Sequence, residues 1–133
     1  MSNPYEKVQN QAVLSMPKEE LTLMLYEGAL KFCNQSIITL EQKDYVKTGE
    51  YIIKVENIIR EFQLTLNRDY EISQQLDAMY DYIHRRLVDA NISKDIAILE
   101  EVRELLRNLR DTWKEAVALA RTQNTPAQQV AQK

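Results

Sequence analysis

The sequence predicts an all-α protein, an antiparallel four-helix bundle, on three observations. No proline occurs between Pro17 and Pro126, so most of the 133-residue chain lacks the strongest helix breaker. The whole chain contains only two glycines. Apolar residues recur every three or four positions along four stretches, as they do on one face of a helix. Because the connections between these stretches are short, neighbouring helices are expected to run antiparallel.

The first predicted helix begins near Ser15 or Met16, ends near Gln42 and carries apolar residues on two sides. At about 100° per residue, these residues separate into two nearly opposite faces. The first face comprises Leu21, Leu25, Gly28 and Phe32, and the second comprises Leu23, Tyr26, Leu30 and Ile37. A bundle helix needs one apolar face for the core. We expect the first face to be that core face and the second to bind a partner.

The second predicted helix follows Asp44, whose carboxylate suits an N-cap, and ends near Asn67, which tolerates a left-handed C-cap. Its apolar stripe is spaced at intervals of three and four residues. The stripe comprises Ile52, Val55, Ile59, Phe62 and Leu66. Val46, Ile53 and Leu64 lie away from this stripe and leave apolar surface elsewhere.

The third helix is expected to open at residues 69–71 and to end at Asn91. The fourth is expected to be capped by Ser93, with Asp95 in its first turn. The third stripe comprises Ile72, Leu76, Met79, Ile83, Leu87 and Ala90, flanked by Tyr80 and Tyr82. The fourth comprises Leu99, Val102, Leu106, Leu109, Trp113, Ala116, Val117 and Ala120, widened by Ile98, Leu105 and Leu119.

The predicted organisation has three parts: an N-terminal arm or short helix over residues 1–16, the bundle over 17–121, and a disordered tail over 122–133. The tail is rich in Thr, Gln, Asn and Ala. Within the bundle, the side chains assigned to the core with the least ambiguity are Leu21, Leu25, Ile59, Met79, Leu106 and Trp113.

Composition narrows the class of protein. The net charge of −3 and the pI of about 5.3 argue against a nucleic-acid binder, which usually carries a basic stripe. The single cysteine fits a reducing compartment. No apolar run is long enough to span a membrane, and the start of the chain lacks a secretory signal pattern. We therefore expect a cytoplasmic protein that neither inserts into membranes nor binds nucleic acid.

Catalytic and metal-binding patterns are missing from the sequence. A carboxylate-bridged di-iron bundle places a Glu-x-x-His pair on each of two helices, whereas this chain has one histidine, His84, preceded by Asp81. Cys33 lies beside Phe32 and is expected to be a small buried apolar residue. No Gly-rich loop can hold a phosphate. We expect no enzyme, no metal site and no cofactor.

Motifs along the chain nevertheless resemble those of the flagellar secretion chaperones, the FliS family, in the same order and at similar spacing. These motifs are Asn3-Pro4-Tyr5, Pro17-x-x-x-Leu21, Met24-Leu25-Tyr26-Glu27-Gly28-Ala29-Leu30, Asn57-Ile58-Ile59-x-Glu61-Phe62, Thr65-Leu66-Asn67, Met79-Tyr80-Asp81-Tyr82-Ile83, Arg86-Leu87-x-x-Ala90-Asn91 and Leu109-Arg110-Asp111-x-Trp113. The resemblance spans about residues 3–118. The chain departs from the family pattern at Val8, often aromatic, and at Met16, often Thr or Ser.

The resemblance implies a cytosolic antiparallel helical bundle that is neither an enzyme nor dependent on a cofactor. Such proteins bind the disordered C-terminal segment of newly made flagellin, prevent its premature polymerisation and support its delivery to the flagellar type III export apparatus. In that family the client wraps around the bundle as helical pieces. The chaperone's own N-terminal arm can cover part of the client groove.

The surplus apolar residues are the candidates for client contact, since an amphipathic segment docks through anchors at helical spacing. The candidate client-binding residues are Tyr5, Val13, Leu23, Tyr26, Leu30, Val46, Ile53, Tyr80, Tyr82, Leu105 and Leu119. Core packing is the alternative for each of them. A different class of function also fits, a homo-oligomeric structural bundle in which identical subunits cover these faces. The client hypothesis instead predicts a monomer or weak dimer, with other flagellar proteins as further possible partners.

Overall fold

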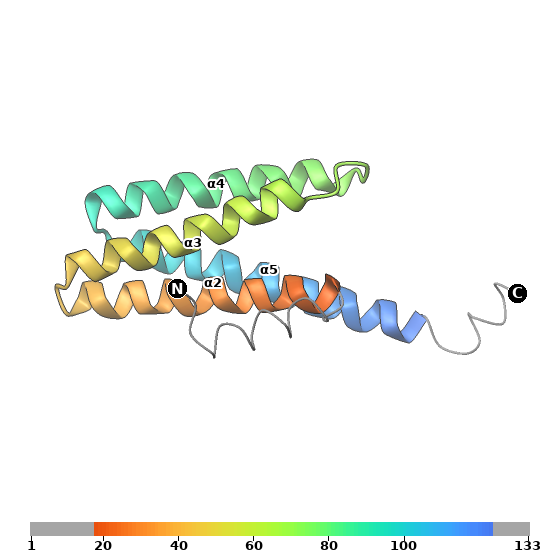
Figure 1. Cartoon of the computed structure of the whole chain (residues 1–133), viewed down its shortest axis with the longest axis horizontal. Helices are drawn as coiled ribbons and strands as arrows, with labels where there is room; N and C mark the ends of the chain where they lie inside the picture. Colours follow the sequence, from red (N-terminus) through yellow and green to blue (C-terminus); the bar gives the residue numbers. More distant parts are fainter. Residues whose placement is uncertain (1–17, 124–133) are drawn as a thin grey trace, which may run out of the picture.

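A computed structural model describes residues 18–123 of the chain, with side chains up to residue 119. Over this range the chain forms four helices and no strand, which confirms the predicted fold class. The helices are α2 (Lys18–Glu41), α3 (Tyr45–Thr65), α4 (Ile72–Ser93) and α5 (Ile96–Gln123). They form an antiparallel bundle (Figure 1). The predicted arm over residues 1–16 lies outside the described residues, whereas α5 extends two residues into the predicted tail.

The four helices do not stay equally close along their length (Figure 1). Helices α2 and α5 lie side by side, and α5 extends past the beginning of α2. Helix α3 begins beside α2 and ends beside α4. Helix α3 therefore lies close to α2 at one end of the bundle and close to α4 at the other. The end near the α3–α4 connection is the one where α3 has moved away from α2.

The boundary between α2 and α3 follows the sequence closely. Asp44 is the N-cap of α3, as predicted, and its carboxylate accepts a hydrogen bond from the backbone N–H of Lys47 at 3.2 Å. Lys43 takes a left-handed conformation with φ of 63°, which turns the chain between the helices. This connection is short enough to enforce the antiparallel pairing of α2 and α3.

Three predicted cap residues were wrong. Asn67 does not end its helix in a left-handed conformation, since the C-cap of α3 is Leu66 in an extended conformation. Asn91 lies within α4, and the left-handed residue is Lys94, with φ of 52° and its N–H donated to the Ala90 carbonyl at 2.7 Å. Ser93 is the last residue of α4 and donates its hydroxyl back to the Asp89 carbonyl.

Helix α5 is preceded instead by Asp95, whose carboxylate accepts a hydrogen bond from the Ala97 N–H at 2.9 Å. An Asp at this place satisfies one of the unpaired amides of the first turn and favours the positive end of the helix dipole. The missed cap shifted the predicted helix boundary by two residues and left the helix face unchanged.

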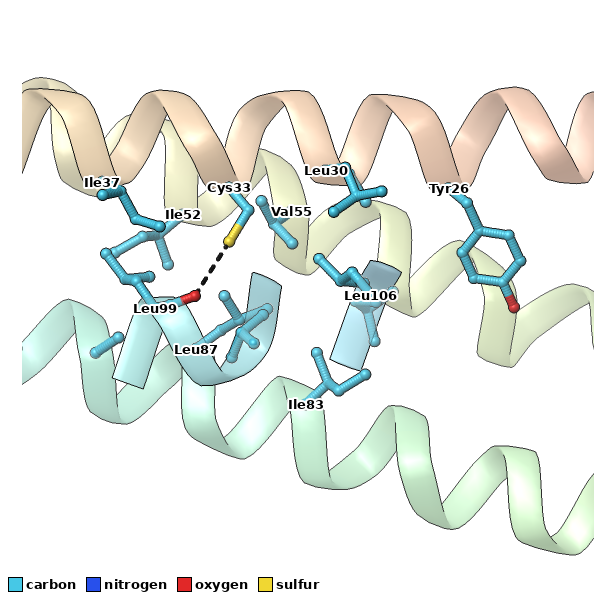
Figure 2. Packing of buried hydrophobic residues seen from close by; sticks show 14 of the residues in the cluster. Tyr26, Leu30, Cys33, Ile37, Ile52, Val55, Ile83, Leu87, Leu99 and Leu106 are labelled. Atoms are coloured by element: carbon cyan, nitrogen blue, oxygen red, sulfur yellow. Dashed lines mark hydrogen bonds between the residues drawn. The ribbon is translucent and has the colours of Figure 1, made fainter. Parts of the chain in front are cut away.

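The core runs between all four helices, and Figure 2 shows its packing. The fully buried residues include Ile59 and Leu106, as predicted. Leu21, Leu25, Met79 and Trp113 are only partly buried. The core comprises Tyr26, Ala29, Leu30, Cys33, Ile37, Leu40, Ile52, Val55, Ile59, Phe62, Tyr80, Ile83, Leu87, Ala90, Leu99, Val102 and Leu106.

The predicted orientation of α2 was wrong. The face assigned to a partner supplies the core, with Tyr26 at 3% and Leu30 at 4% exposure and Ile37 also buried. The face assigned to the core, which includes Leu25 and Phe32, is partly exposed. The physical reason is that Ala29 and Cys33 lie between these larger side chains on the buried side and let neighbouring helices approach. In Figure 2, Tyr26, Leu30, Cys33 and Ile37 follow one another along α2 and point into the bundle.

Candidate binding site

A cleft of about 570 Å³ lies at the end of the bundle near the α3–α4 connection. It lies between the beginning of α2, the end of α3, the beginning of α4 and the second half of α5. The cleft lies at the end of the bundle where α3 diverges from α2 (Figure 1). Most of the lining surface is apolar. The lining residues are Lys18, Glu19, Thr22, Tyr26, Phe62, Thr65, Leu66, Asn67, Tyr70, Ile72, Ser73, Leu76, Tyr80, Leu109, Thr112, Trp113 and Ala116.

Three aromatic side chains from three helices form the buried part of the cleft lining, which we call its floor: Tyr26, Phe62 and Tyr80. The hydroxyls of Tyr26 and Tyr80 share a hydrogen bond of 2.7 Å. The Phe62 ring lies 4.5 Å from the Tyr26 ring and 5.4 Å from the Tyr80 ring, centroid to centroid. Burial raises the pKa of both tyrosine hydroxyls, so both remain protonated at neutral pH.

The wall on the α2 and α5 side is fixed by Trp113. Its indole Nε1–H donates to the Glu19 backbone carbonyl at 2.9 Å, which ties α5 to the first turn of α2. Leu109, one turn earlier in α5, is partly buried against the core. The indole ring therefore offers its apolar surface to the cleft, since its single donor is already used.

The wall on the α3 and α4 side is built around the connection between these helices. Arg68 pairs with Asp77 at 3.2 Å and also donates to the Gln63 carbonyl at 3.1 Å. The Ser73 hydroxyl donates to the Asn67 carbonyl. Two exposed apolar side chains lie at the cleft here: Tyr70 in the connection, at 64% exposure, and Ile72 at the start of α4, at 60%. An exposed apolar rim around an apolar cleft is typical of a protein-binding groove.

Comparison with known proteins gives the family. The sequence model described as "Flagellar protein FliS" matches residues 1–120. The chain belongs to the FliS family. It is 44% identical over 117 residues to a flagellar secretion chaperone FliS of Bacillus subtilis, covering 88% of each chain. It is 37% identical over 107 residues to the Salmonella typhimurium protein of that name, covering 78% of this chain and 79% of the relative.

A solved structure described as "Crystal structure of flagellar chaperone from bacteria" shares the fold. Its TM-score is 0.72 at 18% identity, with 86% of this chain and 98% of that chain covered. The family is one of chaperones and not of enzymes, as the resemblance implied. None of the four described helices combines the length and apolarity that crossing a membrane requires.

In this FliS-family chain the structure brings two of the predicted client-binding residues together. Tyr26 and Tyr80 meet at the cleft floor, although both are almost completely buried. Leu30 is also buried, in the core. The expectation that Leu23, Tyr26 and Leu30 form one surface strip was therefore wrong, because only Leu23 of the three is appreciably exposed.

The other predicted residues that the structure describes lie outside the cleft. Val46, Ile53, Tyr82 and Leu119 are exposed, and Leu105 is partly buried against the core. The Tyr82 hydroxyl donates to Glu101 at 2.8 Å, which also accepts from Arg86 at 2.8 Å. These hydrogen bonds lower the pKa of Glu101 and link α4 to α5. Tyr5 and Val13 lie outside the described residues.

Sequence reasoning missed most of the cleft lining. The sequence predicts Ile72, Leu76, Leu109 and Trp113 as core because they continue the apolar stripes of α4 and α5. The stripes do continue, but none of the helices described over residues 18–123 covers them fully at this end. One signal was present in the sequence: Tyr70 is a large apolar residue in an otherwise polar connection between two helices.

A second groove, of about 410 Å³, lies between α2 and α5 and is mostly polar. Arg110 is paired there with Glu27 at 3.4 Å and with Asp111 at 3.0 Å. Its lining residues are Glu27, Leu30, Lys31, Asn34, Gln35, Arg107 and Arg110. An apolar segment would fit this groove poorly, because the groove is lined mainly by polar and charged side chains.

Cys33 does not have the setting of a reactive thiol. Burial raises the pKa of the Cys33 thiol to about 12, so the thiolate is rare at neutral pH. The same thiol donates a weak hydrogen bond to the Leu99 carbonyl at 3.5 Å (Figure 2). Within the range 18–123, no cluster of three His, Cys, Asp or Glu side chains can hold a metal ion.

Proposed function

We propose that this protein is a cytosolic export chaperone that binds the C-terminal segment of flagellin in the cleft at the α3–α4 end. By holding this segment it prevents premature polymerisation and supports delivery to the flagellar type III export apparatus. Membership of the FliS family and the name "flagellar secretion chaperone" of its relatives support this role. The apolar cleft formed by the described residues is the single observation that supports the binding place.

The chemistry of the cleft suits an amphipathic client helix. Its volume lies within the range of ligand sites in proteins, and its rim exposes Tyr70 and Ile72. Fully burying one large apolar side chain contributes about 1.5–3 kcal/mol, so a few anchors offset the cost of ordering a disordered segment, roughly 2–5 kcal/mol. Such binding holds the client and still permits its release.

Outside the cleft, the exposed apolar side chains are proposed to contact further parts of a client that wraps around the bundle. Val46 and Ile53 lie on α3, Tyr82 on α4 and Leu119 on α5. Leu23 and Leu105 are less accessible. Leu30, being buried, would need a local rearrangement of α2 to take part. The cleft is therefore the proposed primary site and these residues the secondary ones.

The N-terminal arm, residues 1–16, is proposed to cover the cleft when the client is absent. The geometry favours this, because Lys18, the first residue of α2, already lines the cleft. Tyr5 and Val13 are the arm residues proposed to enter it. A fluorophore attached to the arm is expected to lose anisotropy when client is added, and unchanged anisotropy at saturation would count against this part.

Calorimetric titration tests the proposed site. A peptide covering the C-terminal segment of the host's flagellin is titrated into the wild type and into Ile72→Asp and Ile92→Asp. Ile72 and Ile92 lie on the same helix and are exposed by 60% and 80%, but only Ile72 lines the cleft. We expect one-to-one binding with a negative heat-capacity change, weakened about tenfold or more by Ile72→Asp and unchanged by Ile92→Asp.

The outcomes separate the alternatives. No binding to the folded wild type overturns the chaperone proposal. Binding that both variants leave intact overturns the cleft as the site. The rival, a homo-oligomeric bundle, predicts a tight oligomer in sedimentation at micromolar concentration, whereas the chaperone proposal predicts a monomer or weak dimer.

A further inference from the structure

The hydroxyl pair at the cleft floor joins two helices that are distant in sequence. Tyr26 on α2 and Tyr80 on α4 are 54 positions apart, and their oxygens are 2.7 Å from each other. Their side chains are almost fully buried, at 3% and 4% exposure, yet both line the cleft. The pair is therefore a polar point in an otherwise apolar floor.

Counting protons shows that the pair has one donor to spare. Each tyrosine hydroxyl carries one proton, so the two together can donate two hydrogen bonds. The bond between them uses one proton. The structure gives neither hydroxyl a second partner among residues 18–123. A buried donor without an acceptor costs free energy, unless the cleft occupant or water supplies that acceptor.

Three other polar side chains of the cleft lining already use their donors within the chain. The Thr22 hydroxyl donates to the Lys18 carbonyl at 3.0 Å, and the Thr65 hydroxyl donates to the Glu61 carbonyl at 2.9 Å. The indole N–H of Trp113 is likewise paired with the Glu19 carbonyl. Other polar groups, such as those of Lys18 and Tyr70, lie at the exposed rim, where water can serve them.

We propose that the Tyr26–Tyr80 pair determines specificity at the floor of the cleft: its spare hydroxyl proton is donated to an uncharged carbonyl oxygen of the bound segment, from its backbone or from an Asn or Gln side chain. This inference rests on the proposed function, since it concerns what the same cleft selects. An apolar segment that brings such a carbonyl to the floor binds better than one that brings only hydrocarbon.

An uncharged acceptor fits the site better than a carboxylate. Tyr26, Phe62 and Tyr80 supply no cation at the floor, so a carboxylate would lose its hydration there without an ionic partner. The burial that raises the pKa of both hydroxyls also keeps them protonated and able to donate. The pair is thus suited to recognise an uncharged polar group in apolar surroundings.

The test compares two double variants of the full-length chain. Tyr26→Phe/Tyr80→Phe removes both hydroxyls and keeps both rings, a change that is nearly neutral for folding because no partner is left unpaired. Tyr45→Phe/Tyr51→Phe is the matched control, since it removes two hydroxyls from the other end of α3, outside the cleft. The probe is a peptide covering the C-terminal segment of the host's flagellin.

We expect the cleft variant to bind this peptide about tenfold more weakly than the wild type, the size of one buried hydrogen bond, about 1.4 kcal/mol. The control variant is expected to bind like the wild type. Equal binding by the cleft variant and the wild type would overturn the inference while leaving the proposed function intact. Absence of binding by the folded wild type would overturn both.

A second measurement covers the case in which the cleft variant does not fold. In the wild type, ring-labelled tyrosine reports the hydrogen bonding of each hydroxyl through the ¹³Cζ chemical shift. The signal of Tyr26 or Tyr80 is expected to move when peptide is added, because a hydroxyl gains an acceptor. Signals of both residues that stay fixed at saturation would overturn the inference.

Discussion

The two ends of the bundle differ in what lies between the same four helices. Where α2 meets α3 and α4 meets α5, the interior holds small and aliphatic side chains that are fully buried, such as Cys33, Val55 and Leu99. Toward the α3–α4 connection the interior side chains become aromatic, and a cleft of about 570 Å³ opens beside them. We refer to these as the closed end and the open end.

Several buried hydroxyls at the closed end are hydrogen-bonded within the chain, although Gln35 Oε1 and Arg103 Nε are buried there without a partner among the described residues. The hydroxyls of Thr39 and Thr48 share a hydrogen bond of 2.9 Å, and the Ser36 hydroxyl donates to the Cys33 carbonyl at 2.6 Å. Among the described residues, the open end leaves apolar surface uncovered and one hydroxyl proton of the Tyr26–Tyr80 pair without an acceptor. If the proposed function holds, stability and binding belong to different halves of one bundle, because close packing stabilises a fold and an apolar cleft can admit a partner.

The largest expected effect comes from truncating the closed end. Leu99→Ala removes a fully buried side chain from well-packed surroundings and is expected to lower the free energy of unfolding by about 2–5 kcal/mol. Leu109 lines the cleft at the open end. Leu109→Ala is expected to lower the free energy of unfolding by about 1 kcal/mol, since water already reaches that site. Urea denaturation measures both. Equal losses for the two variants would remove the distinction between the ends.

Alkaline pH is expected to lower the stability of the protein through a buried thiol at the closed end, that of Cys33. Burial raises the pKa of Cys33 from 9.0 to about 12, an effect that Arg103 partly opposes. Between these values the unfolded chain has lost the thiol proton and the folded chain retains it, so the free energy of unfolding falls as pH rises. The loss amounts to roughly 2 kcal/mol midway through this range.

Urea denaturation of the wild type and Cys33→Ala between pH 8 and 11 checks this. The wild type is expected to lose stability more steeply than the variant, because the variant has no thiol to ionise. Parallel curves would mean that the Cys33 thiol ionises as easily in the folded chain as in the unfolded one, which its burial does not allow.

A substitution in the cleft wall at the open end is expected to have a smaller effect on stability. Trp113→Phe removes the hydrogen bond from the indole to the Glu19 carbonyl and is expected to cost about 0.5–1.5 kcal/mol. The loss should be local: amide exchange in the first turns of α2 accelerates, and exchange around Ile37 and Ile52 stays as in the wild type. If amide exchange accelerated equally at both ends, the two ends would unfold together and not as separate units.

The smallest effect lies between the ends, at Gly28 on the outer side of α2. A Cβ added there meets the Ile58 Cδ1 at 3.7 Å, an ordinary contact, so tight approach of α3 does not require glycine. Gly28→Ala is expected to stabilise the chain by about 0.5–1 kcal/mol through helix propensity. If Gly28→Ala instead lowers the stability in thermal denaturation, α3 must lie closer to α2 than this contact indicates. Weaker flagellin binding by a more stable variant would add this face to the client site.

The sequence was sufficient for the number of helices, their approximate ends and the packed faces of α3 and α5. Those two helices have one dominant stripe each, and Asp44 is a cap whose chemistry is local. Helix α2 could not be oriented in this way. Its two faces are similarly apolar, and the choice between them depends on Ala29 and Cys33, whose small size matters only once the neighbouring helices are in place.

The cleft was harder to predict for a related reason. A stripe on one helix shows which side is apolar, but whether another helix covers it depends on the direction of α3. The apolar side chains of Leu76 and Leu109 therefore have the same pattern as core residues and a different environment. The pairing of Tyr26 with Tyr80 likewise required the fold, since 54 positions separate them.

Hydrogen exchange of the full-length chain, with and without a saturating flagellin C-terminal peptide, tests the central claim most directly. If the open end receives the client, protection increases at the beginning of α2, around Phe62, around Ile72 and in α5 near Leu109, and the amides near Thr39 and Leu99 keep their rates. Protection that appears mainly at the closed end, with the cleft residues unchanged, would contradict the account.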